Sequence, residues 1–171
     1  MKKILIILLL LLCSGCSIRK DYYVFSFDNY SFAPGYDDLS FARMVYDFET
    51  DETIGKNETV ETAIYSFGNH IADVKFTNYK NKEIKADKAI LSEFDYFFDE
   101  HTNNICKLDG IELSSSIKTN CEMFNGEYIE RNGTACVLSK TVNSKTNTVI
   151  FQGDIYATDQ DKLYRIIISI E

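Results

Sequence analysis

The C-terminal third of this 171-residue chain contains three runs rich in residues that favour β-strands. They are residues 135–142, 148–156 and 163–170, and short polar segments separate them. In the last run apolar and polar residues alternate with a period of two, and because successive side chains of a β-strand point to opposite faces of a sheet, this run predicts a half-buried strand. Three such strands joined by short turns predict an antiparallel meander.

Shorter runs with the same period lie upstream, at residues 23–27, 44–48, 63–67 and 72–76. Gly68-Asn69 separates the last two runs and is typical of a tight turn, so these runs predict a β-hairpin. Several short strands with turns about ten residues apart are typical of all-β domains. The chain is therefore expected to be mainly β, a single antiparallel β-sandwich or small barrel.

The segment at residues 84–98 supports two interpretations. Its even positions are mostly apolar, which predicts a long or bent strand. Apolar residues also recur at the spacing of three and four that is typical of a helix with one apolar face, at Ala86, Ala89, Ile90 and Phe94. One short helix near residues 85–97 is therefore the alternative to a strand.

The N-terminus has a different character. Met1-Lys2-Lys3 precedes an unbroken aliphatic stretch at residues 4–12. A helix that spans a bilayer needs about 20 apolar residues, so this stretch is too short to cross a membrane. A basic end followed by a short apolar stretch is typical of the signal peptide of an exported protein.

Ser14-Gly15-Cys16 follows the apolar stretch, and here the chain resembles the lipobox of bacterial lipoproteins. In that family, small residues precede a cysteine that is lipidated and becomes the mature N-terminus. Cys13 stands where the family usually has Leu or Val, which is a departure from the pattern. The resemblance implies cleavage of a signal peptide before Cys16 and attachment to a membrane through fatty acyl chains, palmitate among them.

The implied organisation has three parts. Residues 1–15 are the signal peptide, residues 16–22 are the lipidated N-terminus and a short tether, and residues 23–171 are one β-rich domain. Each buried acyl methylene contributes about 0.8 kcal/mol, so several chains hold a protein stably where one does not. The resemblance thus implies a lipid-anchored protein on the extracytoplasmic face of a bacterial cell membrane. The alternative is an ordinary cleaved signal peptide in which Cys13 and Cys16 are incidental.

The charge balance excludes one class of partner. The chain has 18 Lys and Arg against 26 Asp and Glu, and removal of Lys2 and Lys3 with the signal peptide leaves 16 against 26, a net charge of −10. Nucleic-acid binding needs clustered basic residues, which this sequence lacks.

Acidic residues are densest at 37–61, where we expect a solvated acidic face. Attraction of cations or of a basic partner is the alternative. No EF-hand pattern is present, so no metal site is predicted.

Three cysteines follow the lipobox, Cys106, Cys121 and Cys136, with equal spacing. An odd number cannot pair completely within one chain, but one disulfide is permitted outside the cell. Cys106 with Cys121 and Cys121 with Cys136 both fit, and the sequence does not choose between them. The spacing lacks the paired Cys-x-x-Cys of a zinc ribbon. A nucleophilic cysteine would need a nearby histidine base. His70 follows the Gly68-Asn69 turn and His101 lies in a polar segment, so neither position favours that role.

Two Asn-Gly pairs, Asn125-Gly126 and Asn132-Gly133, lie between the last two cysteines. Asn-Gly favours turns that need positive φ, so the pairs predict two turns that bracket a short strand. The polar segment Asp159-Gln160-Asp161 is likewise expected to be a turn rather than a cation site.

The usual catalytic and cofactor-binding motifs do not occur in the sequence: there is no Gly-x-Ser-x-Gly, no His-Glu-x-x-His, no phosphate-binding loop and no Gly-x-Gly-x-x-Gly. No catalytic residue and no cofactor are therefore predicted. We expect a non-catalytic module that binds a partner at the cell surface or supports the envelope. The alternatives are an extracytoplasmic hydrolase that uses carboxylates or a Cys-His pair, and a β-barrel carrier of a small ligand.

Overall fold

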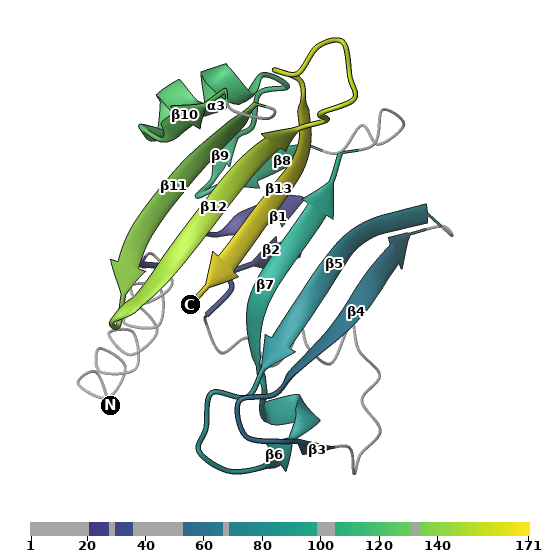
Figure 1. The fold of residues 1–171 in the computed structure, drawn as a ribbon, viewed down its shortest axis with the longest axis vertical. Coiled ribbons are helices and arrows are strands. Elements are labelled where there is room, and N and C mark those ends of the chain that lie inside the picture. The colour runs from purple at the N-terminus through teal and green to yellow at the C-terminus, as the bar shows by residue number, and fades with distance from the viewer. Residues whose placement is uncertain (1–20, 28–29, 36–52, 67–68, 99–104, 131–133) are drawn as a thin grey trace, which may run out of the picture.

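The computed structural model is mainly β, with antiparallel sheets and one short α-helix in the part of the chain that it describes (Figure 1). The described residues are 21–27, 30–35, 53–66, 69–98, 105–130 and 134–171. The predicted β class and antiparallel pairing are therefore confirmed. The strand predicted at residues 44–48 lies outside the described residues.

The larger sheet has seven strands. They are β4 (Thr59–Ser66), β5 (Asn69–Thr77), β7 (Ile90–Phe97), β10 (Glu127–Ile129), β11 (Ala135–Val142), β12 (Lys145–Gly153) and β13 (Leu163–Ile170). Their order across the sheet is β10-β11-β12-β13-β7-β5-β4, and within the described residues the two end strands do not pair with each other. The sheet is open, so the small-barrel alternative is wrong.

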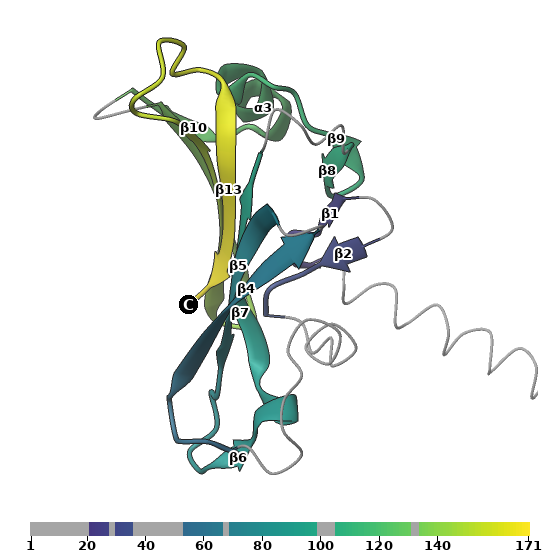
Figure 2. The ribbon, with the colours of Figure 1, turned by 90° about the vertical axis from the view of Figure 1, so that its right-hand side faces the viewer.

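A four-stranded sheet lies over one face of the larger one (Figure 2). Its strands are β1 (Phe25–Phe27), β2 (Tyr30–Phe32), β8 (Cys106–Leu108) and β9 (Ile111–Glu112), in the order β2-β1-β8-β9. A separate two-stranded pair joins β3 (Thr53–Ile54) to β6 (Ile84–Lys85). The two larger sheets form the layers of an open sandwich.

The C-terminal meander is confirmed, since β11, β12 and β13 pair in sequence order with antiparallel registers. The connection between β11 and β12 is shorter than predicted. It consists of Asn143 and Ser144, which have φ values of 51° and 64°. Positive φ at both central residues is what a two-residue hairpin turn requires, because its twist then matches that of the strands. At the other end of β12 the strand stops at Gly153, and Tyr156, which the sequence placed in the strand, lies in the following loop.

The hairpin predicted upstream is confirmed, and one of the two interpretations of the segment at 84–98 is right. β4 and β5 form the predicted hairpin, with a register that runs from Thr59 opposite Thr77 to Ser66 opposite Asn69. In the segment at 84–98 the strand interpretation is right from Ile90 onward, where β7 lies between β13 and β5. Only a single 3₁₀ turn, Ala86–Lys88, precedes it, so the helix alternative is wrong. Strand pairing on both edges outweighs the helical spacing, because it satisfies every backbone group of a buried segment.

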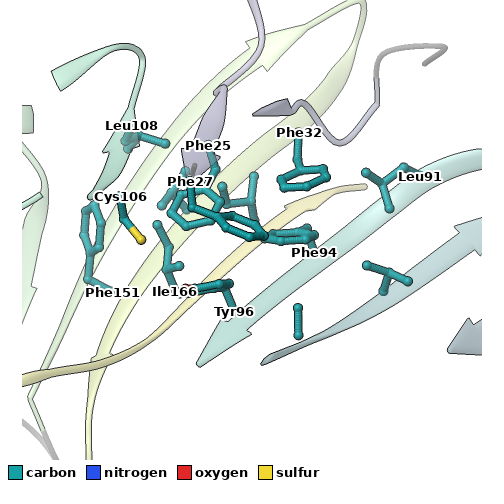
Figure 3. Close-up of a cluster of buried hydrophobic side chains, with 14 of the residues drawn as sticks. Phe25, Phe27, Phe32, Leu91, Phe94, Tyr96, Cys106, Leu108, Phe151 and Ile166 are labelled. Carbon is teal, nitrogen blue, oxygen red and sulfur yellow. The ribbon is translucent and has the colours of Figure 1, made fainter. Parts of the chain in front are cut away.

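Aromatic side chains join the two layers (Figure 3). Phe25 on β1 lies with its ring centroid 5.5 Å from that of Phe94 and 5.2 Å from that of Tyr96, both on β7. Phe27 lies 4.9 Å from Tyr96, and Phe32 stacks on Phe94 at 4.4 Å. All five side chains are buried. Because each aromatic side chain buries about 150–250 Å² of surface, this cluster is a large apolar contact between the layers.

The described α-helix, α3 (Ile117–Phe124), covers one end of the same sheet face (Figure 2). Ser116 caps its N-terminus by accepting a hydrogen bond from the Thr119 amide at 3.1 Å. Asn125 ends it in the left-handed conformation with φ 54°. The pair Asn125-Gly126 is therefore a helix C-cap and not the predicted hairpin turn, although the predicted short strand, β10, does follow it. The second pair, at 132–133, lies outside the described residues.

A disulfide fixes α3 to the larger sheet. Cys121 of α3 bonds to Cys136 of β11, with their Cα atoms 5.6 Å apart. A disulfide that closes a loop of this length stabilises by about 3 kcal/mol in the chain-entropy model. A Cβ atom at Gly126 would collide with Cys136 Sγ and with Leu138, so only glycine fits at this position.

The outer face of the larger sheet carries an ion pair between β7 and β13 in which the carboxylate is buried and the arginine side chain is 33% exposed. Arg165 Nε donates to Asp95 Oδ1 at 2.6 Å, and Arg165 Nη2 donates to Asp95 Oδ2. Asp95 is only 3% exposed, and Asp73 on β5 lies directly opposite it. The hydrogen bond from Arg165 to Asp95 raises the pKa of the guanidinium, and the Asp95, Glu93 and Asp73 charges add to this. The arginine thus offsets a carboxylate that the sheet would otherwise bury without a counter-charge.

Removal of this arginine is expected to be costly. Arg165→Met should lower the free energy of unfolding by about 3 kcal/mol, because it leaves the buried Asp95 carboxylate uncompensated. Asp95→Asn in the Arg165→Met background should recover part of that loss, since the amide carries no charge. Urea unfolding of the single and double variants measures both effects.

The ion pair between Lys75 and Glu93 provides a matched control. Lys75 Nζ lies 2.9 Å from Glu93 Oε1 on the same sheet face, but the two side chains are 37% and 27% exposed. Lys75→Met should therefore cost less than about 1 kcal/mol. The two cations are about equally exposed, and the pairs differ in the burial of the carboxylate. A loss for Arg165→Met no larger than that for Lys75→Met would therefore contradict a stabilising role of the arginine toward a buried carboxylate.

Candidate binding site

A cleft of about 660 Å³ opens at one end of the two layers, where β7 ends and β8 and β13 begin. This is the end at which Figure 1 shows α3 and the connection between β12 and β13. Clefts that hold small ligands usually have volumes of about 300–1,000 Å³, so the size is sufficient for a ligand. The apolar and aromatic part of the lining comes from Phe97, Phe98, Ile105, Leu113, Ala157, Leu163 and Tyr164.

The remaining lining is polar and mostly acidic. Three carboxylates belong to it, those of Glu112, Asp154 and Asp159. Two basic side chains, His70 and Lys162, also line the cleft, together with Ser114 and Ser115. His70 Nε2 lies 2.8 Å from the carboxylate oxygen Oδ1 of Asp73. The cleft therefore combines an apolar surface with a surplus of negative charge.

A buried asparagine holds one wall of the cleft in place. Asn120 on α3 is fully buried, and its side chain makes two hydrogen bonds to Ser114. Its Oδ1 accepts from the Ser114 amide at 2.8 Å, and its Nδ2 donates to the Ser114 carbonyl at 2.8 Å. The Leu163 amide donates to the Ser115 carbonyl at 2.7 Å. These bonds connect α3, the segment before it and the start of β13 into one framework.

The loop between β12 and β13 is held by its own aspartates. Asp154 Oδ1 accepts from the Tyr156 amide at 2.8 Å, and Asp159 Oδ1 accepts from the Asp161 amide at 3.1 Å. Asp161 then accepts from Ser116 Oγ at 2.6 Å and from the Lys118 amide at 2.9 Å. The segment Asp159-Gln160-Asp161 thus forms a turn that also caps α3, as Asp residues commonly do.

Exposed apolar side chains gather around this cleft. Ile105 and Tyr164 line it and are 57% and 43% exposed. Ile155 and Tyr156 lie in the adjoining loop between Asp154 and Ala157, and Tyr156 is 89% exposed. Large apolar residues that stay exposed together commonly mark a binding surface. The sequence pattern placed Ile155 and Tyr156 in the preceding strand and therefore did not indicate this surface.

The first described residues lie at the opposite end of β13 from the cleft. The buried Asn147, near the start of β12, accepts a hydrogen bond from the Tyr23 amide at 2.7 Å. Tyr22 packs in a small buried cluster with Ala33, Val142 and Ile170, the last residue of β13. Leu163 and Tyr164, at the other end of β13, line the cleft. At about 3.4 Å per residue this strand separates the two ends by about 24 Å.

The predicted site residues are distributed unevenly over the structure. Cys16, His101 and the acidic residues from 37 to 52 lie outside the described residues. Of the three later cysteines, Cys121 and Cys136 form the disulfide, and Cys106 is a buried thiol that lines the cleft. His70 lines the same cleft, so the structure brings the two members of a Cys-His pair to one place although 36 positions separate them.

The acidic side chains at the end of the 37–61 segment have structural partners. Glu58 Oε2 accepts from the Gly55 amide at 2.7 Å within a turn. Glu61 lies 3.5 Å from Lys75 on the neighbouring strand. Among the residues that the structure describes, no group of three or more His, Cys, Asp or Glu side chains is placed to hold a metal ion.

Comparisons with protein-family models, with curated proteins and with solved structures gave no match for this chain. No helix within the described ranges is long and apolar enough to cross a membrane.

The reactivity of Cys106 is expected to be that of a structural thiol. Cys106 is only 5% exposed. In the native protein its thiol should therefore react with a disulfide reagent at less than about one tenth of the rate of glutathione. Denaturation without reductant should make Cys106 reactive while Cys121 and Cys136 stay protected as a disulfide. Mass mapping of the labelled peptides measures both results. Native labelling faster than that of glutathione would contradict this expectation and favour the Cys-His hydrolase.

Proposed function

We propose that this protein is a lipid-anchored, non-catalytic binding module on the extracytoplasmic face of a bacterial cell membrane. Lipid on Cys16 holds it there, and the cleft end binds a partner at the cell surface. The observation that carries the proposal is the separation of two ends: the cleft and its exposed apolar side chains lie at one end of β13, and the first described residues lie at the other.

The short tether determines which of the two ends lies close to the membrane. Residues 16–20 can span at most about 18 Å between a lipidated Cys16 and the body, even when fully extended. That reach is shorter than the length of β13, so the end that carries Tyr22 faces the membrane and the cleft faces away from it. A module arranged in this way exposes its cleft to partners in the surrounding medium or on a neighbouring structure.

The charge of the body supports the lipid as the main membrane contact. The mature chain carries a net charge of −10, and an anionic lipid surface would repel it. Two or more acyl chains supply enough apolar burial to hold the protein against that repulsion.

Replacement of the lipidated cysteine tests the anchor. Cys16→Ala should move the protein from the detergent-rich phase to the aqueous phase in a detergent partitioning experiment, because the attachment site for the lipid is gone. Cys13→Ala should leave the partitioning as it is in the natural chain and serves as the matched control. Retention of Cys16→Ala in the detergent-rich phase would contradict the lipid anchor.

A further inference from the structure

The cleft end offers more apolar surface than a small molecule inside the cleft would cover. Ile105 and Tyr164 line the cleft, whereas Ile155 and Tyr156 extend the apolar surface along the adjoining loop. Tyr156 is 89% exposed. Tyrosines are enriched at protein interfaces, where the ring supplies apolar contact and the hydroxyl stays hydrated. An extended chain segment can occupy the cleft and continue over this loop, so the shape favours a peptide.

The charge of the cleft restricts the composition of that peptide. Glu112, Asp154 and Asp159 outnumber Lys162 among its charged lining, and His70 is hydrogen-bonded to Asp73. Hydrogen bonds within the turns hold the carboxylates of Asp154 and Asp159 in place and use one oxygen of each. The net charge of the whole mature chain has the same sign, so the long-range field also attracts cations.

From these observations we infer that the cleft binds a basic, amphipathic peptide segment of another extracytoplasmic protein. Bulky apolar side chains of the segment contact Ile105, Tyr164 and the exposed loop. Flanking Lys or Arg side chains face Glu112, Asp154 and Asp159. This inference rests on the proposed binding function and names the class of partner for it.

A designed peptide tests the inference. Fluorescein-labelled Lys-Lys-Phe-Leu-Lys-Lys is titrated with the full lipidated protein in nanodiscs of neutral phosphatidylcholine, and fluorescence anisotropy measures the Kd against empty nanodiscs. Glu-Glu-Phe-Leu-Glu-Glu and Lys-Lys-Ser-Ser-Lys-Lys are the control peptides. Each should bind at least about tenfold more weakly, because the first is repelled and the second lacks the apolar contact.

Two sets of variants locate the binding. The triple variant Glu112→Gln, Asp154→Asn and Asp159→Asn keeps the oxygen acceptors of the turns and should raise the Kd about tenfold while reducing its salt dependence. Ile105→Ser with Tyr164→Ser should raise the Kd to a similar degree. Glu122→Gln with Met123→Ser changes exposed residues of α3 outside the cleft lining and should leave the Kd unchanged. Equal binding of all three peptides, or unchanged affinity in the first two variants, would overturn the inference.

A second ligand separates failure of this inference from failure of the proposed function. N-phenyl-1-naphthylamine is apolar and uncharged at neutral pH, so the acidic lining does not repel it, and its fluorescence above that with empty nanodiscs reports occupied apolar sites. If it binds the natural protein but not the Ile105→Ser, Tyr164→Ser variant, and the basic peptide does not bind, the class of partner is wrong and the binding cleft stands. If neither ligand binds, both the inference and the proposed binding site are wrong.

Discussion

Rings from β1, β2 and β7 meet between the two sheets, where Phe25, Phe27 and Phe32 pack on Phe94 and Tyr96. Without this contact β1 and β2 would lose their buried aromatic side chains, and strands as short as β1, β8 and β9 do not hold together through their own hydrogen bonds. The same contact fixes β1 across the larger sheet and thereby positions β8, its partner, at the cleft. Both ends of the molecule therefore depend on one aromatic cluster.

The two ends of the molecule on either side of that cluster are held by different contacts. At one end β1 is preceded by Tyr22 and Tyr23, which are held by Asn147 and by the end of β13. At the other end the disulfide, Asn120 and Asp161 hold α3 and the loop between β12 and β13 around the cleft. The end that carries Tyr22 is thus bound tightly into the sheet, and the cleft end exposes apolar side chains on a framework of hydrogen bonds. This division is consistent with the proposed binding module on a short tether.

The sequence predicted the parts of this fold that depend on local pattern. The meander from Ala135 to Ile170 and the hairpin of β4 and β5 follow from alternation and turn residues, which are properties of adjacent positions. It could not predict α3, because the eight-residue helix depends on the disulfide to Cys136 and on capping by the distant Asp161. The cleft could not be predicted either, since its lining comes from eight separate stretches between His70 and Tyr164. The buried pair of Asp95 and Arg165 also joins positions that only the sheet register brings together.

The orientation of the module on a membrane tests the central claim most directly. In a Cys106→Ser background, a fluorescent donor is attached to Ser144→Cys at the end that carries Tyr22 or to Thr158→Cys beside the cleft, and the lipidated protein is placed in vesicles that contain an acceptor lipid. The account predicts clearly stronger energy transfer from position 144, because the turn between β11 and β12 lies at the end that faces the bilayer. Equal transfer from both positions, or stronger transfer from position 158, would contradict it.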